Sequence, residues 1–437
     1  MKRFFIKTMG CKSNQLEGSL IEENLIKNGF ERVLKIEEAE FFILNSCTVT
    51  HKSDSEAFNI LRHSKRKNPE IKNILTGCIA QVEKAKLLEN PDVDIVLGND
   101  EKLNISSFLD VSFSVGEIEN LSSFHDALLT DTKKTRASLK IQDGCDNRCS
   151  YCIIPFARGK NRSADLDFIL EQIKIYEEKG FHEIVLTGIH IGQWGLDFED
   201  KKNLLTLLKA IEEKTTISRF RLGSLNPLEF DDEILDFLQK SKKFCPHFHL
   251  SLQSMCNKTL KAMNRHYTVE KALELIEKIS ERFTLPFIGS DIIAGFAGES
   301  EEDFRTTIEN LKKSKLTQIH TFPYSIRKGT AAEKFENHLD ALTKTERATI
   351  IKEISSQKHI EFLHQNLGSV QEVLIEKNLD PKTGFFKGVT RNYINVLVEP
   401  PLPRIDYDSV MNTVQKVKIT KIYPVVGEFL IHPSGKN

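Results

Sequence analysis

The sequence predicts an α/β protein made of three consecutive folding units. Strand-like and helix-like segments alternate along residues 1–98, and again with a longer period along residues 136–365, as is typical of parallel sheets. From residue 366 to residue 433, short β-rich runs replace this alternation and predict a small β-barrel. A chain of 437 residues is too long for one compact core, which agrees with several domains.

The first unit, residues 1–120, is expected to be a small parallel-sheet α/β domain. Cys11, Cys47 and Cys78 each follow directly on one of its first three predicted strands. Because the carboxyl ends of parallel strands form the crevice where ligands bind, these three thiols should meet at one sheet edge. The predicted strands are residues 2–7, 41–44, 73–75 and 93–97, and the predicted helices are residues 16–27, 53–67 and 81–88.

The second unit, residues 136–365, is expected to be a partial (β/α)6 barrel. Six βα units amount to three-quarters of a TIM barrel, whose active site lies at the carboxyl ends of the strands. A polar, weakly patterned stretch at residues 120–135 should link it to the first unit. The predicted strands are residues 138–142, 183–187, 219–222, 247–252, 287–293 and 318–322, and the predicted helices include residues 165–179, 204–213, 269–282 and 342–364.

The clearest chemical signal is the group Cys145, Cys149 and Cys152, in the loop after the first barrel strand. Three thiolates at this spacing can each bind one iron of a four-iron cluster and leave the fourth iron open, unlike the four-cysteine ligation of ferredoxins. An open iron can bind S-adenosylmethionine (SAM) and pass an electron to its sulfonium. Structural zinc is the alternative, but it needs a fourth ligand, and no Cys or His follows at a usual spacing.

Composition limits the compartment and the partners. A formal net charge of −1 excludes a uniformly basic surface, so any nucleic acid must be held by local patches. No stretch approaches the ~20 apolar residues of a membrane span, and the start of the chain lacks a secretory pattern, so we expect a cytoplasmic protein without a membrane partner. Eight cysteines in that compartment indicate metal or redox chemistry. Cys245 and Cys256 match neither group and are expected to be inert.

Several motifs together resemble the radical SAM methylthiotransferase family along nearly the whole chain. They are Gly10-Cys-Lys-Ser-Asn-Gln15, Leu44-Asn-Ser-Cys-Thr-Val-Thr50, Thr76-Gly-Cys-Ile-Ala-Gln81, the stretch from Lys140 through Cys152 to Ser163, Leu186-Thr-Gly-Ile-His190, Leu250-Ser-Leu-Gln-Ser254 and Asp291-Ile-Ile-Ala-Gly-Phe-Ala-Gly-Glu299. The C-terminal unit is similar to the RNA-binding TRAM module of such enzymes.

The resemblance implies cofactors and partners. Cys11, Cys47 and Cys78 would hold a second, auxiliary [4Fe-4S] cluster linked to sulfur donation. One SAM would supply the methyl group, and another would be cleaved to the 5′-deoxyadenosyl radical. An electron donor such as flavodoxin or ferredoxin would be needed, and we expect a monomer. The residues expected to contact SAM are Tyr151, Thr187, Gly188, Ser254, Gly295 and Glu299, although the last two also suit a plain β-to-α turn.

Three substrates compete within the family: N6-threonylcarbamoyladenosine in tRNA, N6-isopentenyladenosine in tRNA, and an aspartate of a ribosomal protein. Gly-Cys-Lys-x-Asn-Gln and Cys-Thr-Val-Thr resemble the first type, so we expect methylthiolation of C2 of threonylcarbamoyladenosine at position 37 of the anticodon loop. Gly223, Asn226, Met255 and Ala297 depart from the usual pattern near the expected pocket. A non-catalytic zinc- and RNA-binding protein remains the alternative outside the family.

Basic residues in two places are candidates for RNA contact. Arg158 and Arg162 follow the barrel cysteines, and Lys416, Lys418 and Lys421 lie in a predicted strand, residues 414–422, of the C-terminal unit. Lys416 and Lys418 should share a strand face, and Lys421 should lie on the other unless the strand bends. The unit has nine Lys and Arg against seven Asp and Glu from residue 366 on, so its RNA role depends on the resemblance.

Overall fold

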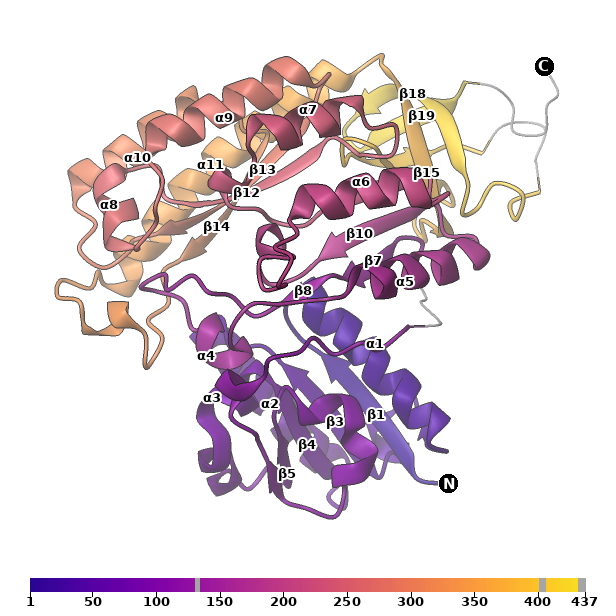
Figure 1. Ribbon diagram of the computed structural model, residues 1–437, viewed down its shortest axis with the longest axis vertical. Helices are drawn as coiled ribbons and strands as arrows, with labels where there is room; N and C mark the ends of the chain where they lie inside the picture. The colour runs from indigo at the N-terminus through magenta and orange to yellow at the C-terminus, as the bar shows by residue number, and fades with distance from the viewer. Residues whose placement is uncertain (130–133, 401–405, 431–437) are drawn as a thin grey trace.

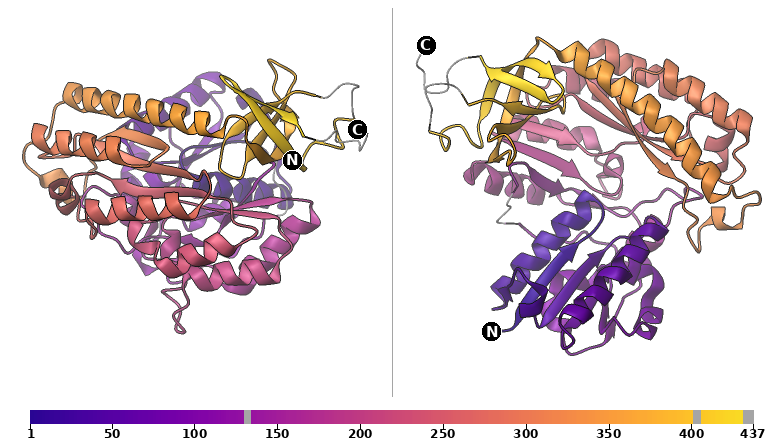
Figure 2. Two further views of the ribbon diagram at one scale, coloured as in Figure 1. Left: turned by 90° about the horizontal axis from the view of Figure 1, so that it is seen from above. Right: turned by 180° about the vertical axis from the view of Figure 1, so that it is seen from behind.

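A computed structural model describes residues 1–129, 134–400 and 406–430 (Figure 1). It contains an N-terminal α/β sheet, a partial barrel and a small closed β-barrel, as the sequence predicts. The closed barrel packs at the end of the partial barrel away from the N-terminal sheet (Figure 2). None of the helices in these ranges is long and apolar enough to cross a membrane.

The N-terminal sheet has six parallel strands in the order β2-β1-β3-β4-β5-β6. Alternate residues of the central strand face opposite layers: Phe42 and Leu44 pack with the helix after β3, and Phe41 and Ile43 pack with the helix after β1. The strands are β1 (Arg3–Thr8), β2 (Glu31–Arg32), β3 (Phe41–Ser46), β4 (Lys72–Gly77), β5 (Ile95–Leu97) and β6 (Phe113–Ser114), and the helices are α1 (Lys12–Lys27), α2 (His51–Lys67) and α3 (Cys78–Glu83).

The central part is a partial barrel of six parallel strands. Two three-stranded sheets, β11-β10-β7 and β12-β13-β14, meet through parallel bridges between Phe220 and Phe244 and between Leu225 and Leu250. Its outer strands are therefore β7 and β14. The strands are β7 (Ala137–Lys140), β10 (Glu183–Thr187), β11 (Arg219–Leu222), β12 (His247–Gln253), β13 (Phe287–Ala294) and β14 (Gln318–Pro323).

Helices cover the outside of these strands (Figure 2). The outward residues of the strands, such as Ile184, Phe220 and Leu250, form one hydrophobic core with the helices. These helices are α5 (Leu166–Glu178), α6 (Leu204–Lys214), α7 (Asp232–Lys240), α8 (Asn257–Ala262), α9 (Val269–Arg282), α10 (Glu301–Lys313) and α11 (Ala341–Asn366). The short helix α4 (Ile154–Arg158) lies instead beside α3 of the N-terminal domain (Figure 1). The short strands β8 (Gln142–Asp143) and β9 (Arg162–Ser163) pair beside the cysteine loop.

The C-terminal part is a closed barrel in the order β15-β16-β17-β19-β18. Its strands are β15 (Val370–Leu379), β16 (Phe386–Thr390), β17 (Asn395–Val398), β18 (Val414–Ile422) and β19 (Val425–Phe429). In β18, Lys416 and Lys418 are exposed and Val417 and Ile419 are buried. An irregularity in the pairing of β18 between Ile419 and Lys421 turns Lys421 outward as well.

Residue 120 of the predicted linker ends a short 3-10 helix, Ile118–Asn120, and its residues 121–129 and 134–135 contain no helix or strand. Residues 130–133 of this predicted linker lie outside the described residues, as do residues 401–405 and 431–433 of the predicted C-terminal unit.

Candidate active site

Cys11, Cys47 and Cys78 stand at the carboxyl edge of three neighbouring strands, β1, β3 and β4. Cys11 caps α1, Cys47 follows β3 directly, and Cys78 opens α3. The glycines before two of them allow sharp strand-to-helix turns, because Gly10 and Gly77 have φ angles of +89° and +90°. A Cβ atom on Gly10 would lie 2.6 Å from the Cys47 Cβ, so no larger residue fits between these two cysteine loops.

The surroundings of these thiols suit an iron–sulfur cluster held by thiolates. Burial, followed by the nearby Cys78, raises the pKa of Cys47 to about 11. A buried thiol loses its proton readily only when a metal compensates the charge. Arg158 adds positive charge close to both Cys47 and Cys78, and its buried Nε has no hydrogen-bond partner among the described residues. Three sulfurs from neighbouring loops with cations behind them fit a three-cysteine iron–sulfur cluster.

The second cysteine group occupies the loop that follows β7 and β8, at the carboxyl end of the partial barrel. The Cys145 amide donates to the Gly159 carbonyl at 3.0 Å, and the Cys152 amide donates to the Cys149 carbonyl at 3.0 Å. His190 Nδ1 lies 3.5 Å from the Cys145 sulfur, and Arg265 Nη1 donates to the Cys149 sulfur at 3.6 Å. Burial raises the pKa of Cys152 to about 12, so this thiol also needs a metal to ionise.

The basic side chain of His190, in the segment after β10, contacts both this loop and Glu229. Burial lowers the pKa of His190, but hydrogen bonds to Cys145 and Glu229 outweigh burial and raise it to about 10. His190 also forms a short ion pair with Glu229.

Within residues 1–129, 134–400 and 406–430, no three His, Cys, Asp or Glu side chains converge as they would around a single metal ion. A four-iron cluster requires a wider arrangement, since each sulfur binds a different iron.

The residues predicted to contact SAM lie at the ends of neighbouring barrel strands, on the same side as the cysteine loop. Thr187 ends β10, Ser254 follows β12, and Gly295 follows β13. Tyr151 packs edge-on against Phe296 at 6.4 Å between ring centroids, so the cysteine loop touches the β13 turn. The Gly188 position leaves no room for a side chain, because a Cβ would lie 2.8 Å from the Gln142 carbonyl oxygen.

Glu299 is engaged within the protein. Arg347 donates to its carboxylate at 2.6 Å and to its carbonyl oxygen at 2.9 Å. Burial raises the pKa of Glu299, although Arg347 opposes the rise. Among the departures from the family pattern, Asn226 caps the short helix that carries Glu229, and Met255 is fully buried in the core. Gly223 and Ala297 also have structural roles. The Gly223 amide donates a hydrogen bond to the Leu186 carbonyl oxygen, and Ala297 is buried beside Phe296.

Contacts between the domains attach the sheet edge that carries the N-terminal cysteines to the barrel end that carries the second cysteine group. Arg327, in the loop after β14, donates to the Thr48 hydroxyl at 2.7 Å and pairs with Asp54 at 2.7 Å. The His51 amide donates to the Ser325 hydroxyl at 3.1 Å. These bonds attach the Cys47 loop to the carboxyl end of the partial barrel, where the second cysteine group lies.

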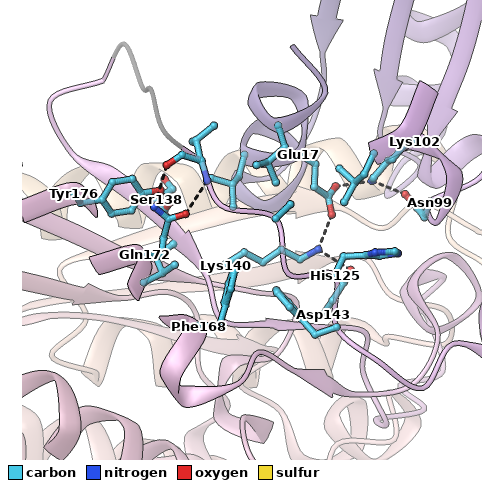
Figure 3. A pocket seen from close by; sticks show the side chains of 17 residues that line it. Glu17, Asn99, Lys102, His125, Ser138, Lys140, Asp143, Phe168, Gln172 and Tyr176 are labelled. Carbon is cyan, nitrogen blue, oxygen red and sulfur yellow. Dashed lines mark hydrogen bonds and ion pairs between the residues drawn. The ribbon is translucent and has the colours of Figure 1, made fainter. Parts of the chain in front are cut away.

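A buried group of charges forms a second junction between the domains, beside a pocket that it lines (Figure 3). The carboxylate of Glu17, in α1, forms ion pairs with Lys102 at 2.5 Å, Lys140 at 2.7 Å and Arg158 at 2.5 Å. Lys140 also pairs with Asp143 at 2.7 Å. These cations hold the pKa of Glu17 well below its usual value, against the opposing effect of burial. One carboxylate thus joins α1 to three cations from different segments.

The expected RNA contact of Arg158 and Arg162 is wrong, because their side chains are only 1% and 4% exposed. Arg158 binds Glu17 and Asn14, and Arg162 donates to the Arg158 carbonyl at 2.9 Å. Both arginines lie inside the domain junction. Their place directly after the cysteine motif suggested a substrate contact, whereas the partner Glu17 lies 141 residues away in sequence.

Sequence reasoning missed Arg265 and Glu229, and it included His190 only within a motif. No spacing rule links these residues to the cysteines, since they lie in the loops and short helices that follow other strands of the barrel. Cys245 and Cys256 are buried, and their thiols lie 3.9 Å from Glu183 and 3.7 Å from Asp303.

Comparison with known proteins agrees with this architecture. Residues 139–311 match the radical SAM superfamily, and residues 3–98 match the uncharacterized protein family UPF0004. Among solved structures, the radical S-adenosylmethionine methyltransferase TsrM from Kitasatospora setae, with cobalamin and a [4Fe-4S] cluster bound, has a TM-score of 0.54 at 13% identity, over 74% of this chain and 75% of that one. The fold and the cysteine loop define a radical SAM enzyme, with SAM and a [4Fe-4S] cluster as its cofactors.

Curated relatives narrow this class. The chain is 37% identical to the threonylcarbamoyladenosine tRNA methylthiotransferase MtaB of Aquifex aeolicus, over 89% of this chain and 95% of the relative. It is 34% identical to MtaB of Bacillus subtilis over 95% and 94%, and 35% identical to the tRNA-2-methylthio-N(6)-dimethylallyladenosine synthase of Thermodesulfovibrio yellowstonii over 89% and 90%. The chain therefore belongs to the radical SAM methylthiotransferase family, which sets aside the non-catalytic zinc-binding alternative.

Proposed function

We propose that this enzyme methylthiolates C2 of N6-threonylcarbamoyladenosine at position 37 of tRNA, using two [4Fe-4S] clusters. The observation that carries the two-cluster proposal is the pair of three-cysteine edges, which interdomain bonds from Arg327 hold close together. Relatives named threonylcarbamoyladenosine tRNA methylthiotransferase support the choice of nucleoside.

Each cysteine group has its own task in this proposal. Cys145, Cys149 and Cys152 hold the cluster that, with SAM, supplies the radical chemistry, and Cys11, Cys47 and Cys78 hold the auxiliary cluster for sulfur donation. Tyr151, Thr187, Gly188, Ser254, Gly295 and Glu299 form or support the SAM site. Arg265 and His190 orient Cys149 and Cys145 and keep positive charge beside their sulfurs.

The substrate enters as an unpaired base of the anticodon loop, which a protein can take up more readily than a base in a duplex. Lys416, Lys418 and Lys421, all exposed on β18, hold the tRNA through its phosphates. We further propose that the enzyme acts as a cytoplasmic monomer with flavodoxin or ferredoxin as electron donor.

Isopentenyladenosine is the second candidate substrate, because several similar relatives are named for the dimethylallyl nucleoside. Nucleoside analysis by mass spectrometry, on tRNA from cells with and without the gene, separates the two. We expect loss of the 2-methylthio form and accumulation of threonylcarbamoyladenosine. A change in the isopentenyladenosine derivative, or no change in any tRNA nucleoside, would contradict the proposal.

A further inference from the structure

The last barrel strand, β14, carries an exposed aromatic side chain near its carboxyl end. Side chains alternate along a strand, and Ile319 packs outward into the core beneath the helices, so His320 and Phe322 point into the partial barrel. The His320 ring stacks on that of His249, in β12, at 5.5 Å between centroids, which agrees with this direction. Phe322 is 49% exposed, and its ring contacts no other aromatic ring in the described part of the chain.

On one side, Phe322 lies next to the residues that support the barrel cysteine loop. It is the cross-strand neighbour of Ile293, in β13. Ile293 and Tyr151 pack against the same small hydrophobic cluster, which contains Phe296. Tyr151 belongs to the cysteine loop itself, directly before Cys152. The exposed ring of Phe322 is therefore close to the barrel cysteine group.

On the other side, the N-terminal cysteine group approaches Phe322 through the loop after β14. Ser325 and Arg327, three and five residues further along the chain, bind the loop that follows Cys47. Val49 of that loop is 51% exposed, although the residues on either side of it are held by these bonds or buried. Two exposed apolar side chains, Phe322 and Val49, thus come from the two segments that join the cysteine groups.

Deeper in the barrel, the same inner face becomes polar. Asp291 is the cross-strand neighbour of His320, two residues or about 7 Å along the strand from Phe322. Its Oδ2 accepts a hydrogen bond from His249 Nε2 at 2.9 Å, and the side chain of Asp291 remains 26% exposed. An aromatic ring with polar groups beside it is the arrangement with which proteins bind an unpaired base, by stacking on its face and hydrogen bonding at its edge.

We propose that the target adenine, unstacked from the anticodon loop, binds by stacking on the ring of Phe322. The inference rests on the proposed function. A base held there lies between the two cysteine groups, which supply the radical chemistry and the sulfur. Asp291 and His249 then lie at the edge of the base. Aromatic stacking tolerates any base, so Phe322 positions the adenine without reading its N6 substituent.

The test measures Kd for two anticodon stem-loop RNAs, one with threonylcarbamoyladenosine at position 37 and one with an abasic nucleotide there. Phe322→Ala should raise Kd for the first RNA by about 5- to 100-fold, as for loss of one stack between a base and an aromatic ring. The abasic RNA should bind Phe322→Ala and the unaltered holoenzyme equally, because it has no base to stack. Phe322→Tyr should retain the affinity. Phe156→Ala is the matched control, since it removes a ring that is 46% exposed on α4.

Photo-cross-linking of the unaltered holoenzyme gives a second, independent measurement. A stem-loop RNA with 8-azidoadenosine at position 37 should attach to residues 318–327, as mapped by peptide mass spectrometry. Attachment only elsewhere, an unchanged Kd in Phe322→Ala, or an equal rise in Kd for both RNAs would overturn the assignment, while the proposed function stands. If the unaltered holoenzyme leaves the threonylcarbamoyladenosine RNA without a methylthio group, the proposed function fails instead.

Discussion

At the scale of single residues, the barrel cysteines make the first prediction. Replacing Cys145, Cys149 and Cys152 together with Ala should remove about half of the iron and abolish 5′-deoxyadenosine formation, because their cluster is the one that cleaves SAM. Iron assay and chromatography of SAM products measure both effects. Cys256→Ala, outside both groups, is the control and should keep full iron. SAM cleavage by the triple variant under reducing conditions would disprove the assignment.

The N-terminal cysteines should behave differently. The triple Ala variant at Cys11, Cys47 and Cys78 should also lose about half of the iron, yet keep SAM cleavage, because the barrel cluster remains. Methylthio transfer should fall below detection in the same assay by nucleoside mass spectrometry. Unchanged iron content would show that these thiols hold no cluster.

His247 predicts a pH dependence of stability. Burial, followed by the charge of Arg221, holds the pKa of His247 well below its usual value. The folded protein keeps the ring neutral, whereas the unfolded chain takes up a proton below about pH 6.5. The unfolded state therefore binds more protons as pH falls, and the free energy of unfolding should drop by ~2 kcal/mol between pH 7 and pH 5 from this group.

In the His247→Phe variant, this contribution to the pH-dependent drop in the free energy of unfolding should disappear. Phenylalanine keeps the ring contacts with Phe287 and Tyr393 but does not titrate. Denaturant unfolding at the two pH values measures it, with exposed His63→Phe as the control. An equal pH dependence in His247→Phe and the unaltered enzyme would contradict the explanation.

At the scale of elements, strand β18 carries the next prediction. Lys416→Glu with Lys418→Glu should weaken tRNA binding and reduce the slope of log affinity against log salt by about 2, because each lysine contacts one phosphate. Filter binding at several salt concentrations measures the slope. Lys382→Glu, in an exposed turn of the same barrel, is the matched control. An unchanged slope would place the tRNA on another surface.

The elements also show what the sequence could predict. Strands β10 and β11 and helix α9 have the predicted bounds, because their apolar residues repeat with a clear period and turn residues delimit them. The strands β2 and β6, two residues each, carry no periodic signal and arise only from pairing with neighbours. The outward turn of Lys421 likewise depends on a local irregularity in pairing that alternation alone cannot predict.

At the scale of the whole molecule, the buried carboxylate of Glu17 makes a prediction about the domain junction. Glu17→Gln leaves Lys102, Lys140 and Arg158 buried with too little negative charge and should cost about 3 kcal/mol of stability. Limited proteolysis between the domains should accelerate, and denaturant unfolding should shift. Exposed Glu178→Gln is the control. Unchanged proteolysis and unfolding would mean that the junction does not depend on this carboxylate.

The candidate site was predictable only in part, for a reason that belongs to the whole molecule. The motif of Cys145, Cys149 and Cys152 is local in sequence and can be recognised from its spacing alone. The strand pattern predicts that Cys11, Cys47 and Cys78 lie at one sheet edge. Arg265, His190 and Glu229 follow three different barrel strands and meet at the cysteine loop only through tertiary packing. No periodicity or spacing in the sequence relates them.

The raised pKa values of Cys47 and Cys152, about 11 and about 12, matter also for a newly synthesised chain. Before iron arrives, these thiols stay protonated at neutral pH, and a protonated thiol is a poor nucleophile that oxidises slowly. Burial that hinders disulfide formation thus preserves the ligands until maturation.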